Sequence, residues 1–343
     1  MEDFFMQQIQ LDRPYRYEDF IIDTQYFEEQ YPDWLKVYRL GESQDGRDII
    51  VYQLGVGEIP IVITAGVHAR ETINTVVLMR IIETYLQLAQ NQEPLVVDYA
   101  LSERILIQNP SFFQEEEDER FVCACKGEGI PVKYYPELYL KQFTFYIIPL
   151  LNPDGYEIAL GGFNTIRSPE IRERAKGMNI AAEDWKGNAR GIDLNRNFPS
   201  VTWLQKFPGD YPGSEKESKA LMDLFAEVPA AGYLDLHSRG KSIYYHKGVM
   251  PLSYNQNQRQ IANRLKEVTG YDLMPPETEI EASDSGGNTV HYFSEHYNRP
   301  AITIETVLEE AFFPLDVRYQ SSTFEEIVLA PLEFVTAILE QYV

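Results

Sequence analysis

A buried strand that gives way to a helix is the feature that most constrains how this chain can fold. The run Ile59–Thr64 is largely apolar and β-branched, it ends near Gly66, and a helical pattern of apolar residues begins at Glu71. This order predicts a sheet that is covered by helices. His68 and Glu71 follow the carboxyl end of the strand, where open α/β sheets hold their ligands. An imidazole and a carboxylate separated by two residues can bind the same divalent metal.

Strands and helices continue to alternate along the sequence. No repeat and no linker rich in glycine, serine or proline divides it. We therefore predict an α/β fold: a single domain, residues 1–343, with a mostly parallel, mixed central sheet flanked by helices. The expected strands are 34–40, 49–54, 59–64, 143–151, 231–236 and 300–306, and the expected helices include 15–31, 71–90, 253–269, 288–297 and 323–342.

Other segments have less regular patterns. Residues 1–14 are a polar lead-in, about 91–142 is expected to be a surface elaboration with an acidic run at 115–119, and 156–190 is expected to be irregular. The Ser214–Glu217 pattern predicts a capping box at the start of a helix. Cys123 and Cys125 lie too close in sequence for an unstrained disulfide, which favours free thiols in a reducing compartment.

The net charge of −23 over 343 residues narrows the classes of partner. It argues against a nucleic-acid surface and against an anionic membrane surface, and it is compatible with amine-bearing substrates. No apolar run reaches membrane-spanning length, and the first residues lack the basic and apolar parts of a signal peptide. A cytoplasmic location is therefore favoured, with secretion left open. The sequence carries no signal for the oligomeric state.

Two histidines and one glutamate form the candidate metal site. His237 ends the expected strand 231–236, much as His68 follows 59–64. With Glu71 they supply two imidazoles and one carboxylate, which leave an open position on a tetrahedral zinc, as in catalytic sites. The alternative is that each residue is simply a hydrogen-bonded strand or helix end. The chain has only five histidines, and all three candidates share the same kind of position, which favours one Zn²⁺ per chain.

Three further polar residues have a chemistry that suits such a site. Glu305 ends an apolar strand, where a carboxylate is costly unless it is paired or used, and near a metal it can take a proton from water. Asp193 can accept the second N–H of a zinc-bound histidine. Arg196 can form a two-pronged contact with a carboxylate. The simpler interpretation is that Glu305 reaches solvent and that Arg196 lies on the surface.

Taken in order, these motifs resemble those of the zinc carboxypeptidases, the carboxypeptidase A and B superfamily. The resemblance covers the chain from about Tyr15 to its end, so no inhibitory pro-domain is expected. Each motif is weak alone, and the ordered set is specific. The matching segments are His68-Ala69-Arg70-Glu71, Asn152-Pro153-Asp154-Gly155-Tyr156, Gly191-Ile192-Asp193-Leu194-Asn195-Arg196-Asn197-Phe198, Leu236-His237-Ser238 and Thr303-Ile304-Glu305.

The resemblance implies a role for each matching residue. It implies that His68, Glu71 and His237 bind zinc and that Glu305 is the general base and then the proton donor to the leaving amine. Asn195 and Arg196 would hold the terminal carboxylate of the substrate, and Asp193 would orient His68. Lys186 falls where the family places an arginine that polarises the scissile carbonyl. A lysine there keeps the positive charge but cannot make the two-pronged contact of a guanidinium group.

A second departure concerns the substrate pocket. The family's mobile tyrosine precedes its Gly-Gly pair, and no tyrosine lies between Asp272 and Thr289, so its role is missing or supplied from elsewhere, with Tyr292 as one candidate. When the family's Gly-Gly pair is matched to Gly286-Gly287, Asp284 and Thr289 fall at positions that line the pocket for the terminal side chain of the substrate. The resemblance places Thr303 in the same pocket. The alternative for Asp284 is that it caps the helix that follows.

A polar pocket that contains a carboxylate suits a side chain with an amine, such as diaminopimelate. The segment Trp185-Lys186-x-Asn188 resembles bacterial members of the superfamily that cut the γ-D-glutamyl–diaminopimelate bond of cell-wall peptides. The leading hypothesis is thus a zinc metallocarboxypeptidase-type hydrolase, which cuts an amide bond near a free carboxylate and uses Glu305 as general base. The alternatives are a zinc deacylase of N-acyl amino acids and, from another class, a catalytically silent binding module.

Overall fold

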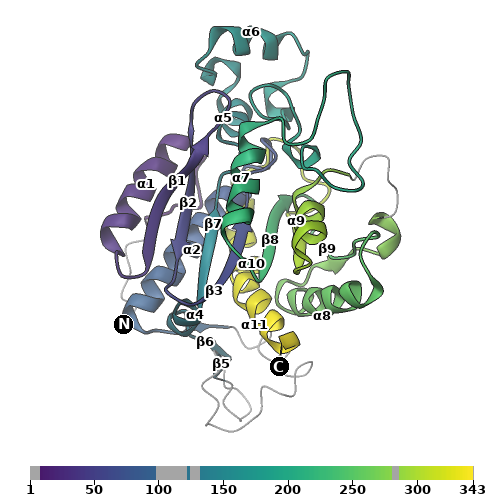
Figure 1. Ribbon diagram of the computed structural model, residues 1–343. Helices are drawn as coiled ribbons and strands as arrows, with labels where there is room; N and C mark the ends of the chain where they lie inside the picture. Colours follow the sequence, from purple (N-terminus) through teal and green to yellow (C-terminus); the bar gives the residue numbers. More distant parts are fainter. Residues whose placement is uncertain (1–7, 98–121, 124–131, 280–285, 343) are drawn as a thin grey trace.

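The computed structural model describes residues 8–97, 122–123, 132–279 and 286–342 (Figure 1). The predicted pocket residue Asp284, the acidic run at 115–119 and Cys125 lie outside these residues. In the described part of the chain, an eight-stranded sheet forms the centre of the molecule, with the order β1-β2-β7-β3-β8-β11-β9-β10. Its strands are β1 (Leu35–Glu42), β2 (Asp48–Leu54), β3 (Ile59–Thr64), β7 (Phe143–Ile148), β8 (Gly232–Ser238), β9 (Ser242–Tyr244), β10 (Asp272–Leu273) and β11 (Ala301–Thr306).

The four central strands of this sheet, β7, β3, β8 and β11, run parallel to one another. Antiparallel pairs flank them: β1 and β2 form a hairpin, β2 pairs with β7, and β9 pairs with β11. The prediction of a mostly parallel, mixed sheet is therefore confirmed. A second, small sheet is made of β4 (Leu95–Val96), β6 (Lys133–Tyr134) and β5 (Val122–Cys123).

Helices cover both faces of the central sheet (Figure 1). Ile61 and Ile63 of β3 face the apolar cluster that includes α1, α2 and α11, whereas Val62 between them faces α7 and α9. This alternation is the two-residue period of a strand buried on both sides. The helices are α1 (Tyr17–Gln30), α2 (Ile73–Asn91), α4 (Pro136–Gln142), α5 (Pro153–Gly161), α6 (Pro169–Lys176), α7 (Lys216–Glu227), α8 (Leu252–Thr269), α9 (Thr289–Tyr297), α10 (Tyr319–Ile327) and α11 (Ala330–Tyr342). None of the described helices is both long and apolar enough to cross a membrane.

Two predicted segments differ from the observed ones. The stretch 156–190 is not irregular throughout, because α5 and α6 lie in it or begin just before it; each starts with a proline at its first position, and the side chains of Asn152 and Ser168 cap them. The single final helix is instead two helices, α10 and α11. Pro331 is the second residue of α11 and has no N–H to continue the α10 ladder, which explains the break.

The capping box predicted at Ser214–Glu217 is wrong. Helix α7 begins at Lys216 with Glu215 as its N-cap residue, and no side chain caps it. Glu217 instead turns toward the body of the protein and accepts hydrogen bonds from the Gln44 N–H at 3.0 Å and from Asn188 Nδ2 at 3.2 Å. Tertiary contacts thus outcompete the local cap.

The end of the predicted surface elaboration at 91–142 is part of the main core. Tyr134, Tyr139 and Leu140 are fully buried there and pack in the cluster that contains α2. The Tyr134 hydroxyl donates to Glu333 of α11 at 2.5 Å, which ties this segment to the C-terminal helix.

The buried carboxyl of Glu217 predicts a pH-dependent stability. Burial raises its pKa to about 7, and the nearby charge of Asp154 adds to the shift. The folded protein therefore holds this proton more tightly than the unfolded chain does, and stability falls as pH rises from about 4.5 to about 7. Relative to Glu217→Gln, wild type should lose on the order of 3 kcal/mol of unfolding free energy across this range. Denaturant unfolding at pH 4.5, 6 and 8 measures the difference.

The quantity compared is how the unfolding free energies of wild type and Glu217→Gln change with pH, so any pH-independent effect of the substitution cancels. Glu173→Gln is the matched control, because Glu173 is 73% exposed and its curve should run parallel to that of wild type. Parallel curves for wild type and Glu217→Gln would contradict the assignment of this proton to Glu217.

Candidate metal centre and active-site cavity

The candidate site lies at the carboxyl ends of the central parallel strands. Strands β8 and β11 pair in register, so that His237 lies opposite Glu305. His68 and Glu71 come from the turn between β3 and α2, and β3 is the other neighbour of β8. Residues more than 230 positions apart in the sequence thus meet at one edge of the sheet, as expected for this class of fold.

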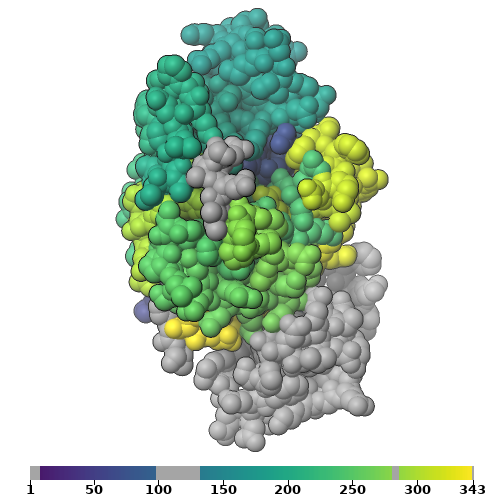
Figure 2. Space-filling view, turned by 90° about the vertical axis from the view of Figure 1, so that its right-hand side faces the viewer, coloured from purple at the N-terminus to yellow at the C-terminus, as the bar shows by residue number. Residues whose placement is uncertain are grey.

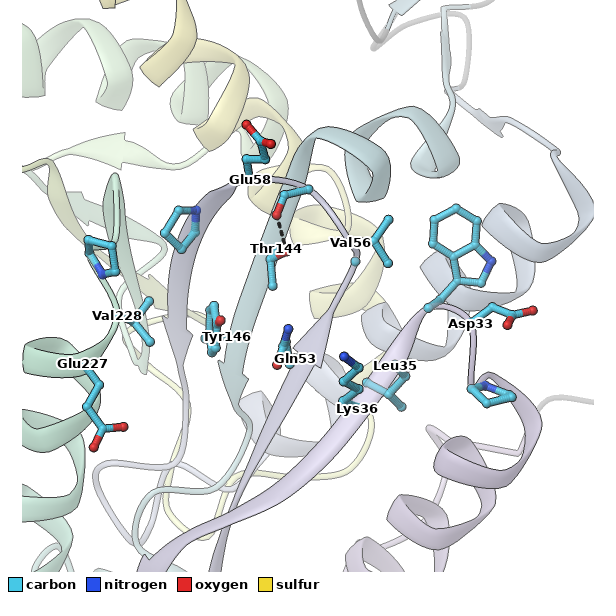
Figure 3. A pocket seen from close by; sticks show the side chains of 16 residues that line it. Asp33, Leu35, Lys36, Gln53, Val56, Glu58, Thr144, Tyr146, Glu227 and Val228 are labelled. Carbon is cyan, nitrogen blue, oxygen red and sulfur yellow. Dashed lines mark hydrogen bonds between the residues drawn. The ribbon is translucent and has the colours of Figure 1, made fainter.

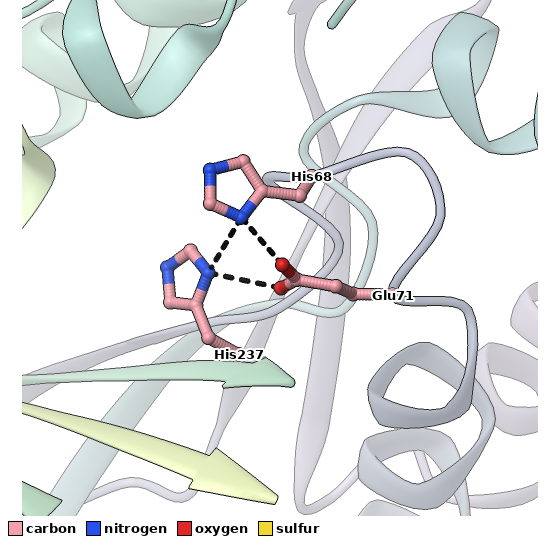
Figure 4. Close-up of side chains that lie close together, drawn as sticks. All are labelled: His68, Glu71 and His237. Carbon is pink, nitrogen blue, oxygen red and sulfur yellow. Dashed lines mark hydrogen bonds and ion pairs between the residues drawn. The ribbon is translucent and has the colours of Figure 1, made fainter. Parts of the chain in front are cut away.

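His68, Glu71 and His237 converge on a common point (Figure 4). His68 Nδ1 lies 2.7 Å from Glu71 Oε1, and His237 Nδ1 lies 3.0 Å from Glu71 Oε2. The two Nδ1 atoms are 3.2 Å apart. All three side chains are buried, and their ligand atoms lie within 4.8 Å of one another.

The outer nitrogen of each imidazole faces a carboxylate. His237 Nε2 is 3.0 Å from Asp235 Oδ2, and His68 Nε2 is 3.2 Å from Asp193 Oδ1, although this second contact is not aligned as a hydrogen bond. A carboxylate at Nε2 favours the N–H there and leaves Nδ1 as an acceptor. Two acceptor nitrogens that face each other require a proton or a cation between them, so this donor set fits a metal ion.

Asp235 is a residue that the sequence argument missed. It precedes His237 by two positions on β8, and a two-residue spacing on a strand puts both side chains on one face, which was the available signal. Thr64 and Thr289 donate hydrogen bonds to its two oxygens. Asp193 lies where the sequence argument expected it, near the other histidine.

Charges in the site shift the pKa values of its buried groups. Burial opposes ionisation of Glu71, but His68 and His237 outweigh it and hold the pKa of this carboxyl below its ordinary range. Burial also disfavours the charged form of His237, yet Asp235 and Glu71 raise its pKa well above the ordinary value. The surplus of carboxylates around two imidazoles gives the site a negative charge that a divalent cation would balance.

A cavity of about 390 Å³ opens beside these ligands. Figure 2 shows the molecule from this side, with a hollow between the teal segment and the yellow segment near residue 310. Glu305 lines the cavity, and its buried Oε2 has no hydrogen-bond partner among the described residues. Burial and the neighbouring Glu71 raise the pKa of Glu305 to about 8. The residues around the cavity are His68, Arg70, Glu71, Lys186, Asn195, Arg196, Ser238, Arg239, Tyr244, Thr278, Glu279, Asn288, Val290, Thr303, Glu305, Glu309 and Phe313.

Lys186 reaches the same cavity, and its Nζ lies 2.9 Å from Asp193 Oδ2. Its backbone carbonyl accepts the Ala69 N–H at 3.0 Å, which fixes the Trp185–Asn188 segment beside the metal-site turn. Asp193 therefore contacts both Lys186 and His68. Burial opposes its ionisation, but the neighbouring His68, Lys186 and Arg196 hold its pKa well below the ordinary range.

Asn195 and Arg196 also line the cavity. They lie in the 3₁₀ turn Leu194–Arg196, which begins where Asp193 Oδ1 accepts the Asn195 N–H at 3.0 Å. Asn195 Oδ1 accepts the N–H of Thr289 at 3.1 Å, and Arg196 donates to the Asn195 carbonyl at 2.8 Å.

The predicted pocket residues have different positions. Thr303 lines the cavity, whereas Thr289 is fully buried and directs its hydroxyl to Asp235, so it supports the site from behind. Tyr292 does not face the cavity either: it packs against Phe198 in the apolar cluster under α7 and α9. A tyrosine that does line the cavity is Tyr244 of β9. The sequence comparison missed it because the family's tyrosine was sought in the segment before Gly286-Gly287, and Tyr244 lies on a strand outside that segment.

A second hollow of about 440 Å³ lies at the opposite edge of the sheet (Figure 3). It is lined by residues near the amino ends of β3 and β7, among them Glu58, Thr144 and Glu227. The group of potential metal ligands found among the described residues lies at the other edge, so we assign no chemistry to this hollow.

Comparison with known proteins agrees with this geometry. The family model of the zinc carboxypeptidases matches residues 22–107 and 136–327, which is more than half of the chain. Gamma-D-glutamyl-L-diamino acid endopeptidase 1 of Lysinibacillus sphaericus is 24% identical over 91% of this chain and 70% of its own length. The uncharacterized protein YqgT of Bacillus subtilis is 30% identical over 46% of this chain, and the match spans less than half, 44%, of that relative.

Solved structures show the same fold. The crystal structure of thrombin activatable fibrinolysis inhibitor superposes with a TM-score of 0.70 over 98% of this chain and 78% of that one, at 16% identity. Carboxypeptidase A from Helicoverpa armigera gives a TM-score of 0.62 over 96% and 75%, at 20% identity. These structures show the fold, and the family match together with the buried His-Glu-His group leads to one conclusion: the chain belongs to the zinc carboxypeptidase family and is a zinc-dependent metallopeptidase.

Proposed function

We propose that this peptidase cuts an amide bond beside a residue with a free carboxylate, and that γ-D-glutamyl–diamino acid peptides are among its substrates. The observation that carries the first part is one cavity, whose lining combines two of the metal ligands, His68 and Glu71, with Glu305, Asn195 and Arg196. An arginine fork pairs with a carboxylate in a defined orientation, so Arg196 would fix the substrate end beside the metal site.

His68, Glu71 and His237 would hold the zinc, which when bound acidifies water and polarises a carbonyl oxygen. Glu305 then takes the proton from the attacking water and passes it to the leaving amine. Its buried Oε2, which has no partner in the described structure, is free to do so. Asp235 orients His237 through its hydrogen bond to Nε2, and the carboxylate of Asp193 lies 3.2 Å from the outer nitrogen of His68.

Lys186 would stabilise negative charge on the carbonyl oxygen in place of the family's arginine. Lys186 lines the cavity, its side chain is 35% exposed, and its ammonium group lies 2.9 Å from Asp193 Oδ2. An ammonium group supplies charge without a fork, which is sufficient for one developing oxyanion.

The diamino acid part of the proposal rests on the polar walls of the cavity. Glu279 lines it, as do Thr303 and Tyr244. Its Oε2 lies 3.0 Å from His291 Nε2, and its Oε1 lies 3.7 Å from Nζ of the buried Lys247. Burial opposes its ionisation, but the charge of Lys247 and the contact with His291 lower the pKa of Glu279 to about 2, so it is a carboxylate at neutral pH. It can pair with the amine of a diamino acid side chain, and the name of the Lysinibacillus relative supports the same class.

A substrate panel tests this proposal. Zinc-loaded protein is incubated with a γ-D-glutamyl–diaminopimelate peptide, with peptides ending in phenylalanine or arginine, and with N-acyl amino acids. We expect kcat/KM for the diaminopimelate peptide to be about tenfold or more above the others, the effect of one charge-assisted contact.

Amidation of the carboxylate on the leaving residue is the matched control, and it should lower kcat/KM by a similar factor. Efficient hydrolysis of ordinary peptides with the γ-D-glutamyl peptide left intact would contradict the diamino acid assignment. Preference for N-acyl amino acids over all peptides would favour a deacylase.

A further inference from the structure

Two arginines in the active-site cavity have no anionic partner within the described residues. Arg70 lies between the metal ligands His68 and Glu71, and Arg239 follows Ser238 at the end of β8. Both line the cavity. Arg70 Nε is buried and has no hydrogen-bond partner in the described part of the chain, and an unpaired buried donor is costly unless a ligand satisfies it.

Phe313 holds the two guanidinium groups together. Its ring lies 4.4 Å from the Arg70 guanidinium carbon and 5.4 Å from that of Arg239, within the range of cation–π contacts. Like charges repel, so two arginines that share one ring in a cavity form a site that an anion would stabilise. The ring also limits the rotamers of both side chains, which lowers the cost of ordering them around a ligand.

This cluster is separate from the arginine that would bind the leaving residue. Arg196 belongs to the wall built by the 195–203 and 286–289 segments, where its carbonyl accepts from Trp203 and its neighbour Asn195 accepts from Thr289. Arg70 and Arg239 belong to the wall closed by Phe313. The cavity is thus lined by two sets of arginines with different neighbours, and each set can pair with a carboxylate.

We propose that Arg70 and Arg239 form an anion subsite for a free carboxylate on the acyl side of the scissile amide. The inference rests on the proposed function, because a γ-linked glutamyl group carries such a carboxylate on its α-carbon, next to the chain that ends in the scissile carbonyl. The enzyme would then recognise a carboxylate on the acyl group as well as the carboxylate of the leaving residue. The carboxylate is bound and released unchanged, so no chemical step is added.

The test compares two peptides that differ in one group. Both contain a γ-D-glutamyl–diaminopimelate bond, one with a free α-carboxylate and one with an α-carboxamide. For wild type we expect kcat/KM to be about 10- to 100-fold higher for the carboxylate, as for a charge-assisted arginine contact. Arg70→Gln and Arg239→Gln should each reduce this ratio by about tenfold or more. Arg318→Gln is the matched control, because Arg318 stacks on Tyr319 at 5.0 Å away from the cavity and should leave the ratio unchanged.

A ratio near one in wild type, or an unchanged ratio in both variants, would overturn the subsite. A purely structural role for the arginines would lower both rates together and leave the ratio intact. If neither peptide is cut, the proposed substrate class is wrong, and calorimetry still tests the subsite. Zinc-loaded wild type should then bind N-acetyl-D-glutamate more tightly than its α-amide by a similar factor, and Arg239→Gln should not. Equal binding of the two probes by wild type would overturn the subsite on its own.

Discussion

Replacing Glu305 with glutamine is expected to remove nearly all peptide hydrolysis while zinc stays bound. The side chain keeps its size and one acceptor oxygen but can no longer take a proton from water. General acid–base catalysis contributes about 100- to 10,000-fold, so kcat should fall by about 1,000-fold. The measurement is kcat on the best substrate of the panel, with zinc content determined on the same sample.

The environment of Glu305 also predicts the direction of the pH profile. Burial and Glu71 raise its pKa to about 8, so without a nearby cation the carboxyl is largely protonated at neutral pH. A general base must be ionised, so activity should rise as the pH increases through the pKa of Glu305. A cation bound by His68, Glu71 and His237 would lower this pKa and so move the rise in activity to lower pH. The residual activity of Glu305→Gln should not show this rise with pH.

Glu309→Gln is the control for this substitution. Glu309 lines the same cavity but is exposed, and no catalytic step is assigned to it. It should keep most of the wild-type activity. A Glu305→Gln enzyme within tenfold of wild type would refute the role of Glu305 as general base, whatever its zinc content.

The sequence predicted the parts of the fold that depend on local pattern. Apolar runs at 59–64, 231–236 and 300–306 are buried on both faces, and this leaves a continuous signal that marks strands and their ends. Because His68, His237 and Glu305 follow or end these strands, their positions along the chain were enough to place the candidate site at one sheet edge. The break between α10 and α11 and the absent cap of α7 were missed because tertiary contacts and one proline decide them.

The sequence did not predict which side chains complete the cavity. Counting along one segment assigned Thr289 to the pocket, but α9 turns its hydroxyl toward Asp235. Tyr244 and Phe313 reach the cavity from β9 and from the 307–315 loop, so no spacing within one motif could reveal them. In the sequence, Arg70 is only one of the two variable residues between the metal ligands His68 and Glu71. That its Nε has no hydrogen-bond partner among the described residues can be seen only in the structure.

Glu71→Gln, in contrast to Glu305→Gln, is expected to lose zinc. Glu71 is the carboxylate that both imidazoles face, at 2.7 and 3.0 Å, and its Oε2 also accepts the Ser238 N–H at 3.0 Å. A neutral amide keeps the shape but removes the charge that attracts the cation, and its NH₂ group points a donor into the ligand set. Zinc affinity should fall by about 100-fold or more, since even residues that only orient a ligand account for about 10- to 100-fold.

Zinc content after dialysis against metal-free buffer measures this effect. Wild type and Glu305→Gln should retain about one zinc per chain, and Glu71→Gln should retain far less. Zinc should also raise the melting temperature of wild type and Glu305→Gln more than that of Glu71→Gln, because a ligand stabilises only the state that binds it. The two substitutions exchange the same atoms within one buried site, so opposite zinc contents would separate the metal ligand from the proton acceptor. Equal zinc retention in both would show that Glu71 does not hold the metal.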